Sequence, residues 1–304
     1  MLLHNFLQIR PLSLFAALLL FAATPATRAE GATPKPLIVA TIKPLALIAT
    51  ELLGPAAEVR RLLPDGASPH AYALRVSERR LLARADVVLW VGPGLEAFLA
   101  DALRDRPGEQ VLAAATLADI HWPPGDHHRG EAGHGADLHL WLDPHNAIAI
   151  ANGLAAALSA RGHAVPATAA SAFAARMVQL EADIRTRLAQ APDRAFAADH
   201  EAFGHFAARF GLTPAGHLRD AADHAVGARS VAALTARTDI RCLVAEPDSQ
   251  PQRMRHLAER LGARLQVIDA LGAGLTAGDG RGYERLLRRV ADDFASCLGG
   301  PEMP

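Results

Sequence analysis

The sequence is 304 residues long, half of its residues are apolar, and its formal net charge at pH 7 is −1. This length allows two domains of ordinary size. A nearly neutral balance of charges argues against a nucleic-acid partner, which usually demands a basic face. The chain carries 14 histidines, and their positions hold most of the functional information.

The N-terminal segment, residues 1–29, has the layout of a secretory signal peptide. Arg10 precedes an apolar stretch from Leu12 to Ala23, and small residues follow. The stretch is shorter than the roughly 20 residues of a membrane-spanning helix, which disfavours the alternative of an anchoring helix. No Cys lies near the exit of this segment, which excludes a lipid anchor there. We expect a soluble periplasmic chain that begins near Glu30.

Residues 30–163 alternate between strand and helix patterns and form the expected N-terminal lobe. Strands are predicted at Leu37–Ala40, Glu58–Leu63, Asp86–Val91 and Gln110–Ala113, and helices at Leu45–Leu53, at Glu78–Ala85 with Ser77 as N-cap, and at Leu95–Arg104. Such alternation predicts parallel strand pairing.

The lobe ends with a loop and a shorter pattern. Pro, Gly, His and acidic residues dominate 115–136, which predicts a surface loop. Leu138, Leu140 and Leu142 then alternate with His139, Trp141 and Asp143, a period that places the leucines on one face of a strand. Asp143 and Pro144 have the residue types of an N-cap and a first helical position.

Residues 164–191 are predicted to be a long helix that connects two lobes. Its apolar residues recur at three- and four-residue spacing: Phe173, Met177, Leu180, Ile184 and Leu188. The alternation returns in residues 192–304, the expected C-terminal lobe, with strands at Arg194–Ala198, Arg241–Ala245 and Arg264–Ile268 and helices at Ala202–Phe210, Val231–Arg237, Pro251–Leu261 and Gly282–Leu298. The sequence therefore predicts an α/β protein with two parallel-sheet lobes.

The chain has two cysteines, Cys242 and Cys297. In an oxidising compartment an even pair usually closes a disulfide. The alternative is two buried thiols, and the export signal favours the bridge.

Three residues follow predicted strands, His70, His200 and Asp269, and His139 lies on the segment that leads into Asp143 and Pro144. Ligands of open α/β sheets bind beyond the carboxyl ends of the strands. Three imidazoles and a carboxylate suit tetrahedral Zn²⁺, whereas Mn²⁺ favours more oxygen donors. A closed set of four ligands is typical of carriage, because a hydrolase keeps one position for water. Each residue alone could be structural, Asp269 as a helix cap for example, so the prediction depends on the joint pattern.

The loop 115–136 adds four histidines: His121, His127, His128 and His134. Short His-rich tracts bind transition metals loosely, which makes this loop a candidate auxiliary zinc site; a flexible polar loop with incidental histidines is the alternative. His163, His205, His217, His224 and His256 have no comparable placement and are predicted to be structural or surface residues.

These motifs resemble the zinc-specific solute-binding proteins of ABC transporters, the high-affinity zinc uptake group. The resemblance runs from Leu37 to Leu298, and its most specific pieces are Gly66–His70, Asp137–Pro144, Asp199–Phe206, Leu243–Pro247 and Asp269–Gly272. It implies two α/β lobes joined by a rigid helix, with the metal held in the cleft between them.

The resemblance also implies roles for particular residues. His70, His139 and His200 take the places of the imidazole ligands, and Asp269 that of a carboxylate near the metal. Manganese-binding relatives carry Glu at the position of His200, so the His implies zinc. The cysteine pair and the His-containing loop also resemble the zinc branch. Some members have an acidic residue where this chain has Pro69, which leaves open whether Asp269 or water completes the site.

The expected function follows from both lines of argument. We expect a periplasmic monomer, not an enzyme, that captures Zn²⁺ and delivers it to an ABC transporter permease. One alternative is a manganese or iron carrier of the same fold. The other is a secreted zinc hydrolase with Glu201 or Glu246 as general base, although the sequence has no His-Glu-x-x-His motif.

Overall fold

The computed structural model describes residues 34–124, 136–189, 191, 195–276 and 278–299. They contain two four-stranded sheets, in which every strand pair is parallel, so the predicted α/β fold with two lobes is confirmed. Both lobes belong to one compact unit that begins at Lys35. In the described ranges we find no helix whose length and apolarity would let it cross a bilayer.

The N-terminal sheet has the strand order β2-β1-β3-β4. Its strands are β1 (Leu37–Ala40), β2 (Glu58–Arg61), β3 (Val87–Trp90) and β4 (Val111–Ala113), and its helices are α1 (Lys43–Leu53), α2 (Val76–Arg84), α3 (Ala100–Leu103) and α4 (Pro144–Ala160). Every residue of the central strands β1 and β3 is buried. Continuous apolar runs are expected there, because parallel sheets carry helices on both faces.

The C-terminal sheet has the strand order β6-β5-β7-β8. Its strands are β5 (Ala195–His200), β6 (Thr213–Arg219), β7 (Cys242–Ala245) and β8 (Arg264–Val267), and its helices are α6 (Gly204–Phe210), α7 (Ala228–Thr235) and α8 (Pro251–Leu261). Successive side chains of β5 pack into two different hydrophobic cores. Phe196 packs into the core that continues through the N-terminal lobe, and Ala197 into a second core with Leu234 and Leu257. This alternation is the period of two expected of a strand.

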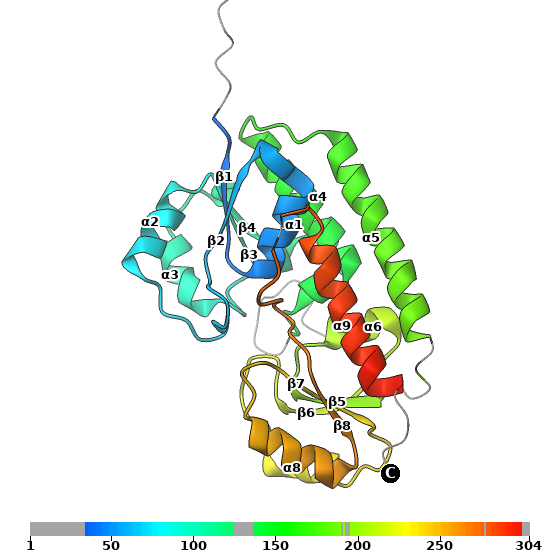
Figure 1. The fold of residues 1–304 in the computed structure, drawn as a ribbon. Coiled ribbons are helices and arrows are strands. Elements are labelled where there is room, and N and C mark those ends of the chain that lie inside the picture. The colour runs from blue at the N-terminus through cyan, green and yellow to red at the C-terminus, as the bar shows by residue number, and fades with distance from the viewer. Residues whose placement is uncertain (1–33, 125–135, 190, 192–194, 277, 300–304) are drawn as a thin grey trace, which may run out of the picture. The chain divides into compact units, whose positions relative to one another are not determined.

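Two long helices, α5 (Ala167–Leu188) and α9 (Gly282–Gly299), run side by side along the lobes (Figure 1). The five apolar residues that predicted α5 are all buried. Helix α9 also packs against α1 of the N-terminal lobe and against β7 and β8 of the C-terminal lobe. The sequence analysis predicted a helix at Gly282–Leu298 but did not predict that this helix would contact both lobes.

Helix α9 is fastened at both ends. At its start, the carboxylate of Glu51 on α1 accepts hydrogen bonds from the backbone N–H groups of Tyr283 and Glu284, at 2.5 and 3.4 Å. Near its end, Cys297 forms the predicted disulfide with Cys242 of β7. The first attachment joins α9 to the N-terminal lobe and the second joins it to the C-terminal lobe.

Residues 137–143 correct one prediction. They form no strand; Leu140–Leu142 make a short 3₁₀ helix, η5, and the side chains of both alternating sets are buried. The reason is that this segment is enclosed on all sides: the indole N–H of Trp141 donates to the carbonyl of Ala270 (2.9 Å), and the hydroxyl of Tyr283 donates to the carbonyl of Trp141 (2.6 Å). Asp143 caps α4, as predicted, by accepting from the N–H of His145 (2.8 Å).

The predicted start of α2 is also wrong. The N-cap is Arg75 and not Ser77. The carboxylate of Glu78 folds back and accepts a hydrogen bond from the backbone N–H of Arg75 (2.8 Å), which satisfies a donor at the helix start without a hydroxyl cap.

Glu96 gives the N-terminal lobe a pH-dependent stability. Its side chain is completely buried, accepts hydrogen bonds from the N–H groups of Val91 (2.7 Å) and Gly92 (3.4 Å), and has its pKa raised by burial from 4.5 to about 7. The folded state therefore binds the proton more tightly than the unfolded state. The free energy of unfolding must fall as the pH rises from about 4.5 to about 7.

Glu96→Gln removes this titration and keeps a side-chain oxygen for the backbone donors. Relative to the variant, the wild type should lose about 2 kcal/mol of stability between pH 5 and pH 8. Urea unfolding of the metal-free proteins, with chelator present, measures the difference. Parallel pH profiles of the two proteins would contradict the expectation.

Candidate metal centre

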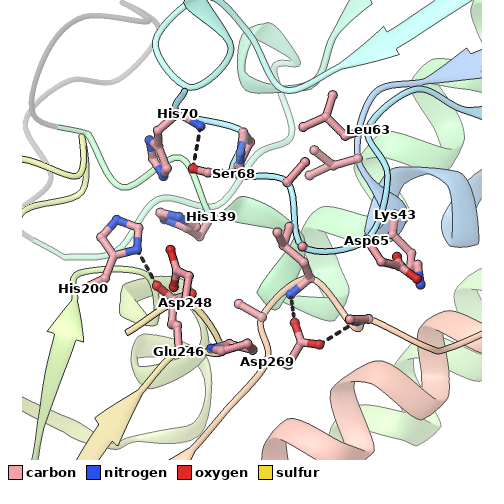
Figure 2. A pocket seen from close by; sticks show the side chains of 18 of the residues that line it. Lys43, Leu63, Asp65, Ser68, His70, His139, His200, Glu246, Asp248 and Asp269 are labelled. Carbon is pink, nitrogen blue, oxygen red and sulfur yellow. Dashed lines mark hydrogen bonds and ion pairs between the residues drawn. The ribbon is translucent and has the colours of Figure 1, made fainter. Parts of the chain in front are cut away.

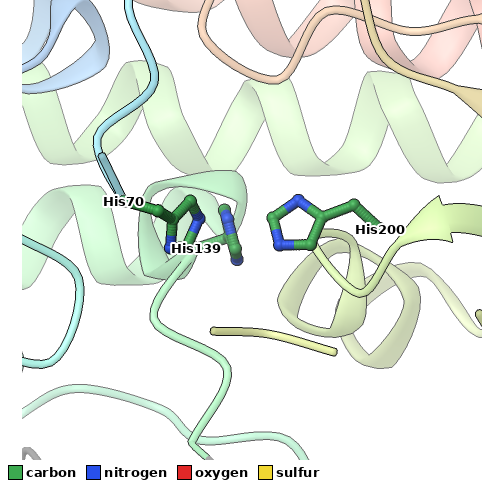
Figure 3. Close-up of side chains that lie close together, drawn as sticks. All are labelled: His70, His139 and His200. Atoms are coloured by element: carbon green, nitrogen blue, oxygen red, sulfur yellow. The ribbon is translucent and has the colours of Figure 1, made fainter. Parts of the chain in front are cut away.

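Three of the predicted site residues lie together. His70 is on the irregular segment that follows β2, His139 directly precedes η5, and His200 is the last residue of β5. Their ring centroids are 5.5 Å (His70–His139), 5.1 Å (His70–His200) and 4.9 Å (His139–His200) apart. One nitrogen of each ring lies within 4.8 Å of the others (Figure 3). The fold thus brings together imidazoles that are up to 130 residues apart in the sequence.

The triad is withdrawn from solvent. His139 and His200 are each 3% exposed, and His70 is partly buried. The Nε2 atoms of His70 and His200 are buried and have no hydrogen-bond partner among the residues the structure describes. A buried polar atom without a partner destabilises a fold by roughly 1–3 kcal/mol, so these two nitrogens are suited to bind something that enters the site.

Carboxylates orient two of the three rings. Asp137 Oδ1 lies 2.8 Å from Nδ1 of His139 and also accepts the backbone N–H of His139 at 3.0 Å. Glu246 Oε2 lies 2.8 Å from Nδ1 of His200 (Figure 2). A carboxylate on Nδ1 fixes the tautomer and leaves Nε2 with its lone pair, the arrangement common behind metal-binding histidines.

Burial and neighbouring groups shift the pKa values of His70, His200 and Asp137. Burial, together with the neighbouring rings of His139 and His200, lowers the pKa of His70 from 6.5 to about 3. Burial also acts to lower the pKa of His200, but the hydrogen bond and the negative charge of Glu246, with the charge of Asp223, together raise that pKa. Burial alone would raise the pKa of Asp137, yet the hydrogen bonds with His139 and the charges of His139 and His205 together hold it below its usual range. His70 is therefore a neutral lone-pair donor at any physiological pH.

The structure does not bring Asp269 into the triad. Its carboxylate accepts hydrogen bonds from the backbone N–H groups of Leu271 (2.9 Å), Gly272 (2.8 Å) and Ala273 (2.5 Å), and so closes the turn after β8 (Figure 2). Asp269 still lines the same cavity, of about 290 Å³, as the three histidines. Asp269 therefore lines the cavity while both of its carboxylate oxygens accept hydrogen bonds from the turn.

The cavity has a second polar end, away from the triad. There Nζ of Lys43 pairs with Oδ1 of Asp65 at 2.6 Å, and Arg61 also pairs with Asp65. Arg61 comes from the end of β2 and Lys43 from the start of α1. These two cations therefore pair with the Asp65 carboxylate, at the end of the cavity away from the triad.

The remaining histidines of the prediction fall elsewhere. His121 is exposed, and its Nδ1 lies 2.7 Å from a guanidinium nitrogen of Arg209, outside the triad. His127, His128 and His134 lie outside the described residues. His205 is buried and structural, as predicted, because its Nε2 lies 2.8 Å from the carbonyl oxygen of Asp137.

The sequence argument missed two residues as partners of the histidine rings: Asp137, and Glu246, which it named only as a candidate base of the hydrolase alternative. The signal for Glu246 was available: it directly follows β7, the neighbour of β5 in the sheet, so the strand-end rule that selected His200 also applies to Glu246. The signal for Asp137 is its position two residues before His139, which lets one oxygen reach both the backbone and the ring of that histidine.

Comparison with known proteins connects this site to a family. The family model described as zinc-uptake complex component A, periplasmic, matches residues 38–297. The high-affinity zinc uptake system protein ZnuA of Yersinia pestis is 30% identical over 331 residues, which cover 97% of this chain and 99% of that protein. The protein of the same name from Haemophilus ducreyi is 31% identical over 288 residues, which cover 86% of this chain and 93% of that protein.

Solved structures share the fold at lower identity. A zinc-bound deletion mutant of ZnuA superposes with a TM-score of 0.73 at 19% identity and covers 88% of this chain and 100% of its own. The periplasmic zinc-binding protein TroA from Treponema pallidum gives 0.71 at 20% identity, with the same coverage of 88% and 100%. FpvC of Pseudomonas aeruginosa in complex with Ni²⁺ gives 0.72 at 22% identity and covers 89% of this chain and 100% of its own. From the family match and these relatives, the chain belongs to the family of periplasmic components A of zinc-uptake complexes.

Proposed function

We propose that this chain captures Zn²⁺ with His70, His139 and His200 and delivers it to the permease of an ABC transporter. The observation that carries the proposal is the convergence of three ring nitrogens within 4.8 Å of one another, from segments of both lobes. Zinc takes imidazole ligands without a geometric preference from its d electrons, so three imidazole nitrogens suit it. The family membership and the names of the relatives support the same cargo.

The donor atoms, and not the fold, decide which metal is carried. FpvC has the same fold and is described in complexes with Ni²⁺ and with Mn²⁺. Mn²⁺ prefers oxygen ligands, and the carboxylates nearest this triad are bonded to its histidine rings. We therefore place a manganese or iron carrier second.

Competition between metals tests this choice. The metal-free chain is equilibrated with Zn²⁺ and Mn²⁺ at equal free concentrations, and the bound metals are counted by mass spectrometry. We expect zinc to be the bound ion, and we would repeat the test with Fe²⁺ under anaerobic conditions. Retention of manganese or iron in preference to zinc would overturn the proposal.

The fourth coordination position is proposed for a water molecule rather than Asp269. To bind the metal, Asp269 would have to give up its three backbone N–H partners. Asp269→Asn keeps an oxygen for the N–H groups of Leu271 and Gly272, loses the acceptor of the Ala273 N–H, and removes a strong zinc ligand. We expect the variant to lose less than about tenfold in zinc affinity. A tenfold loss is the low end of the range for residues that support a metal site from outside the ligand set. A loss of 100-fold or more in chelator competition would return Asp269 to the ligand set.

The hydrolase alternative has little support from the site. The family consists of solute-binding transport proteins, which are not enzymes. Of the two candidate bases, Glu246 is bonded to His200, and Glu201 lies 3.5 Å from His217. We infer that the zinc-loaded chain is not a catalyst, and we expect no turnover of ester, peptide or phosphate substrates. Turnover that needs the triad would contradict this inference.

The cellular setting of the proposal follows from the sequence and the family. We propose that residues 1–29 are a cleaved export signal, so the intact mass of the periplasmic form should correspond to a start near Glu30. Residues 30–163 and 192–304 are then the two lobes, and 164–191 the connection.

A monomer suffices for the proposed function, because one chain supplies all three imidazoles. The histidines of 115–136 are proposed as a looser capture segment, and replacing His127, His128 and His134 by Ala should leave the affinity of the main site unchanged.

A further inference from the structure

The polar groups behind His200 form a continuous network at the ends of three adjacent strands. Asp199 is at the end of β5, Arg219 at the end of β6, and Ser249 follows β7. We use the name brace for these three residues. Asp199 is 4% and Ser249 8% exposed, and no brace residue belongs to the triad.

Ser249 holds the backbone of Glu246 from both directions. The Ser249 hydroxyl accepts a hydrogen bond from the N–H of Glu246 (2.9 Å), and the Ser249 N–H donates to the carbonyl of Glu246 (3.0 Å). The same hydroxyl donates to Oδ2 of Asp199 at 2.6 Å. Its proton and one lone pair are therefore both used, and the turn 246–249 is tied to β5.

Asp199 and Arg219 complete the brace. Nη2 of Arg219 donates to Oδ2 of Asp199 at 2.9 Å, the same oxygen that accepts from Ser249. Nη1 of Arg219 pairs with Asp223, whose backbone has a φ of 68°, in the left-handed region that a residue with a side chain rarely adopts. The chain holds Asp223 in this conformation, where it pairs with Arg219 of the brace.

We propose that the brace positions the imidazole of His200 through Glu246. The carboxylate of Glu246 is the hydrogen-bond partner of Nδ1 of His200, and Nε2 of that ring is the buried nitrogen without a partner. A shift in the backbone of Glu246 would move the carboxylate and turn the ring away from the other two imidazoles. Ser249 and Asp199 are therefore positioning residues for metal binding, an inference that rests on the proposed zinc function.

Ser249→Ala tests the proposal, because it removes only the hydroxyl. We expect zinc to dissociate about tenfold faster and bind about tenfold more weakly, as is typical when a partner outside the ligand set is lost. The visible spectrum of the Co²⁺-loaded protein should also change in band position or intensity, which reports the ligand geometry and not the stability of the fold. Ser249→Thr keeps the hydroxyl and should restore both readouts.

Controls separate a positioning role from a general loss of structure. Ser171→Ala removes the hydroxyl of an exposed residue on α5, which donates to the carbonyl of Thr168 and belongs neither to the triad nor to the brace, and should leave zinc binding and the Co²⁺ spectrum unchanged. If Ser249→Ala does not fold, Asp199→Asn is the second variant. It keeps an acceptor for Ser249 and replaces the ion pair with Arg219 by a weaker interaction. We therefore expect smaller changes in zinc affinity, in the dissociation rate and in the Co²⁺ spectrum.

The outcomes distinguish the two proposals. If the wild-type chain does not bind zinc, the proposed function fails before the brace is tested. If the wild type binds zinc and folded Ser249→Ala and Asp199→Asn variants match it within twofold in affinity and in Co²⁺ spectrum, the brace has no positioning role. A loss of affinity with an unchanged spectrum would also overturn the inference, because the ring would not have moved.

Discussion

Replacing His200 by Ala is expected to weaken zinc binding about 100- to 1,000-fold. Structural zinc sites with four ligands release roughly 10–16 kcal/mol on binding, so one ligand contributes about 3 kcal/mol, or more than 100-fold in affinity. His200 is 3% exposed, and its ring lies about equally close to the rings of His70 (5.1 Å) and His139 (4.9 Å). Its loss leaves only two imidazoles and removes the hydrogen-bond partner of Glu246.

The effect is measured by competition with a zinc chelator at neutral pH. His256→Ala is the matched control, because His256 is an exposed histidine on α8, outside the triad. This control should bind zinc like the wild type. The unfolding transition of metal-free His200→Ala should stay cooperative. An affinity within threefold of the wild type would remove His200 from the ligand set.

Removing the Cys242–Cys297 disulfide is expected to lower the free energy of unfolding by about 4 kcal/mol. The bridge joins residues separated by 55 positions, and in the chain-entropy model a loop of that length restricts the unfolded chain by about 4 kcal/mol. In a chain of this size, such a loss lowers the thermal midpoint by about 8–15 °C. The bridge also fastens α9 to β7, so its loss should loosen the end of α9 first.

Cys242→Ala combined with Cys297→Ala is compared with the wild type by thermal unfolding in the presence of a chelator. Both cysteines are buried, so part of any loss reflects their packing. Reduction of the wild type with a phosphine reductant, which removes the bridge and keeps the sulfur atoms, separates the two contributions. The reductant should have no effect on the double variant. A wild-type midpoint that stays constant on full reduction would contradict the expected stabilisation.

The buried strands were predictable because several features of their sequences agree. Val87–Trp90 is a short apolar run with two β-branched residues, and Gly92 and Pro93 follow it, which favours a strand covered on both faces. Strand β6 was not predicted, because Pro214 and Gly216 are residues typical of turns. It lies at the edge of the described sheet, next to β5, a position in which Pro is tolerated.

The triad was predictable for a related reason. His200 ends a strand and His70 follows one, and parallel sheets direct their strand ends to a common side. Asp269 satisfied the same rule, yet its carboxylate is used by backbone N–H groups three and four residues ahead. A strand-end position indicates which residues reach the site but cannot show which backbone donors compete for them. The strand predicted around His139 was wrong for a related reason. Contacts with the other lobe bury the side chains of both alternating sets, so the alternation in the sequence did not reflect a buried and an exposed face.

The central claim is a single zinc site assembled from both lobes, and chelator competition on the mature chain tests it most directly. Zinc stoichiometry and affinity are measured for the wild type, for His70→Ala in the N-terminal lobe and for His200→Ala in the C-terminal lobe. We predict one tight site per wild-type chain, which both variants lose. Tight binding that survives in either variant would place the site elsewhere and contradict the account.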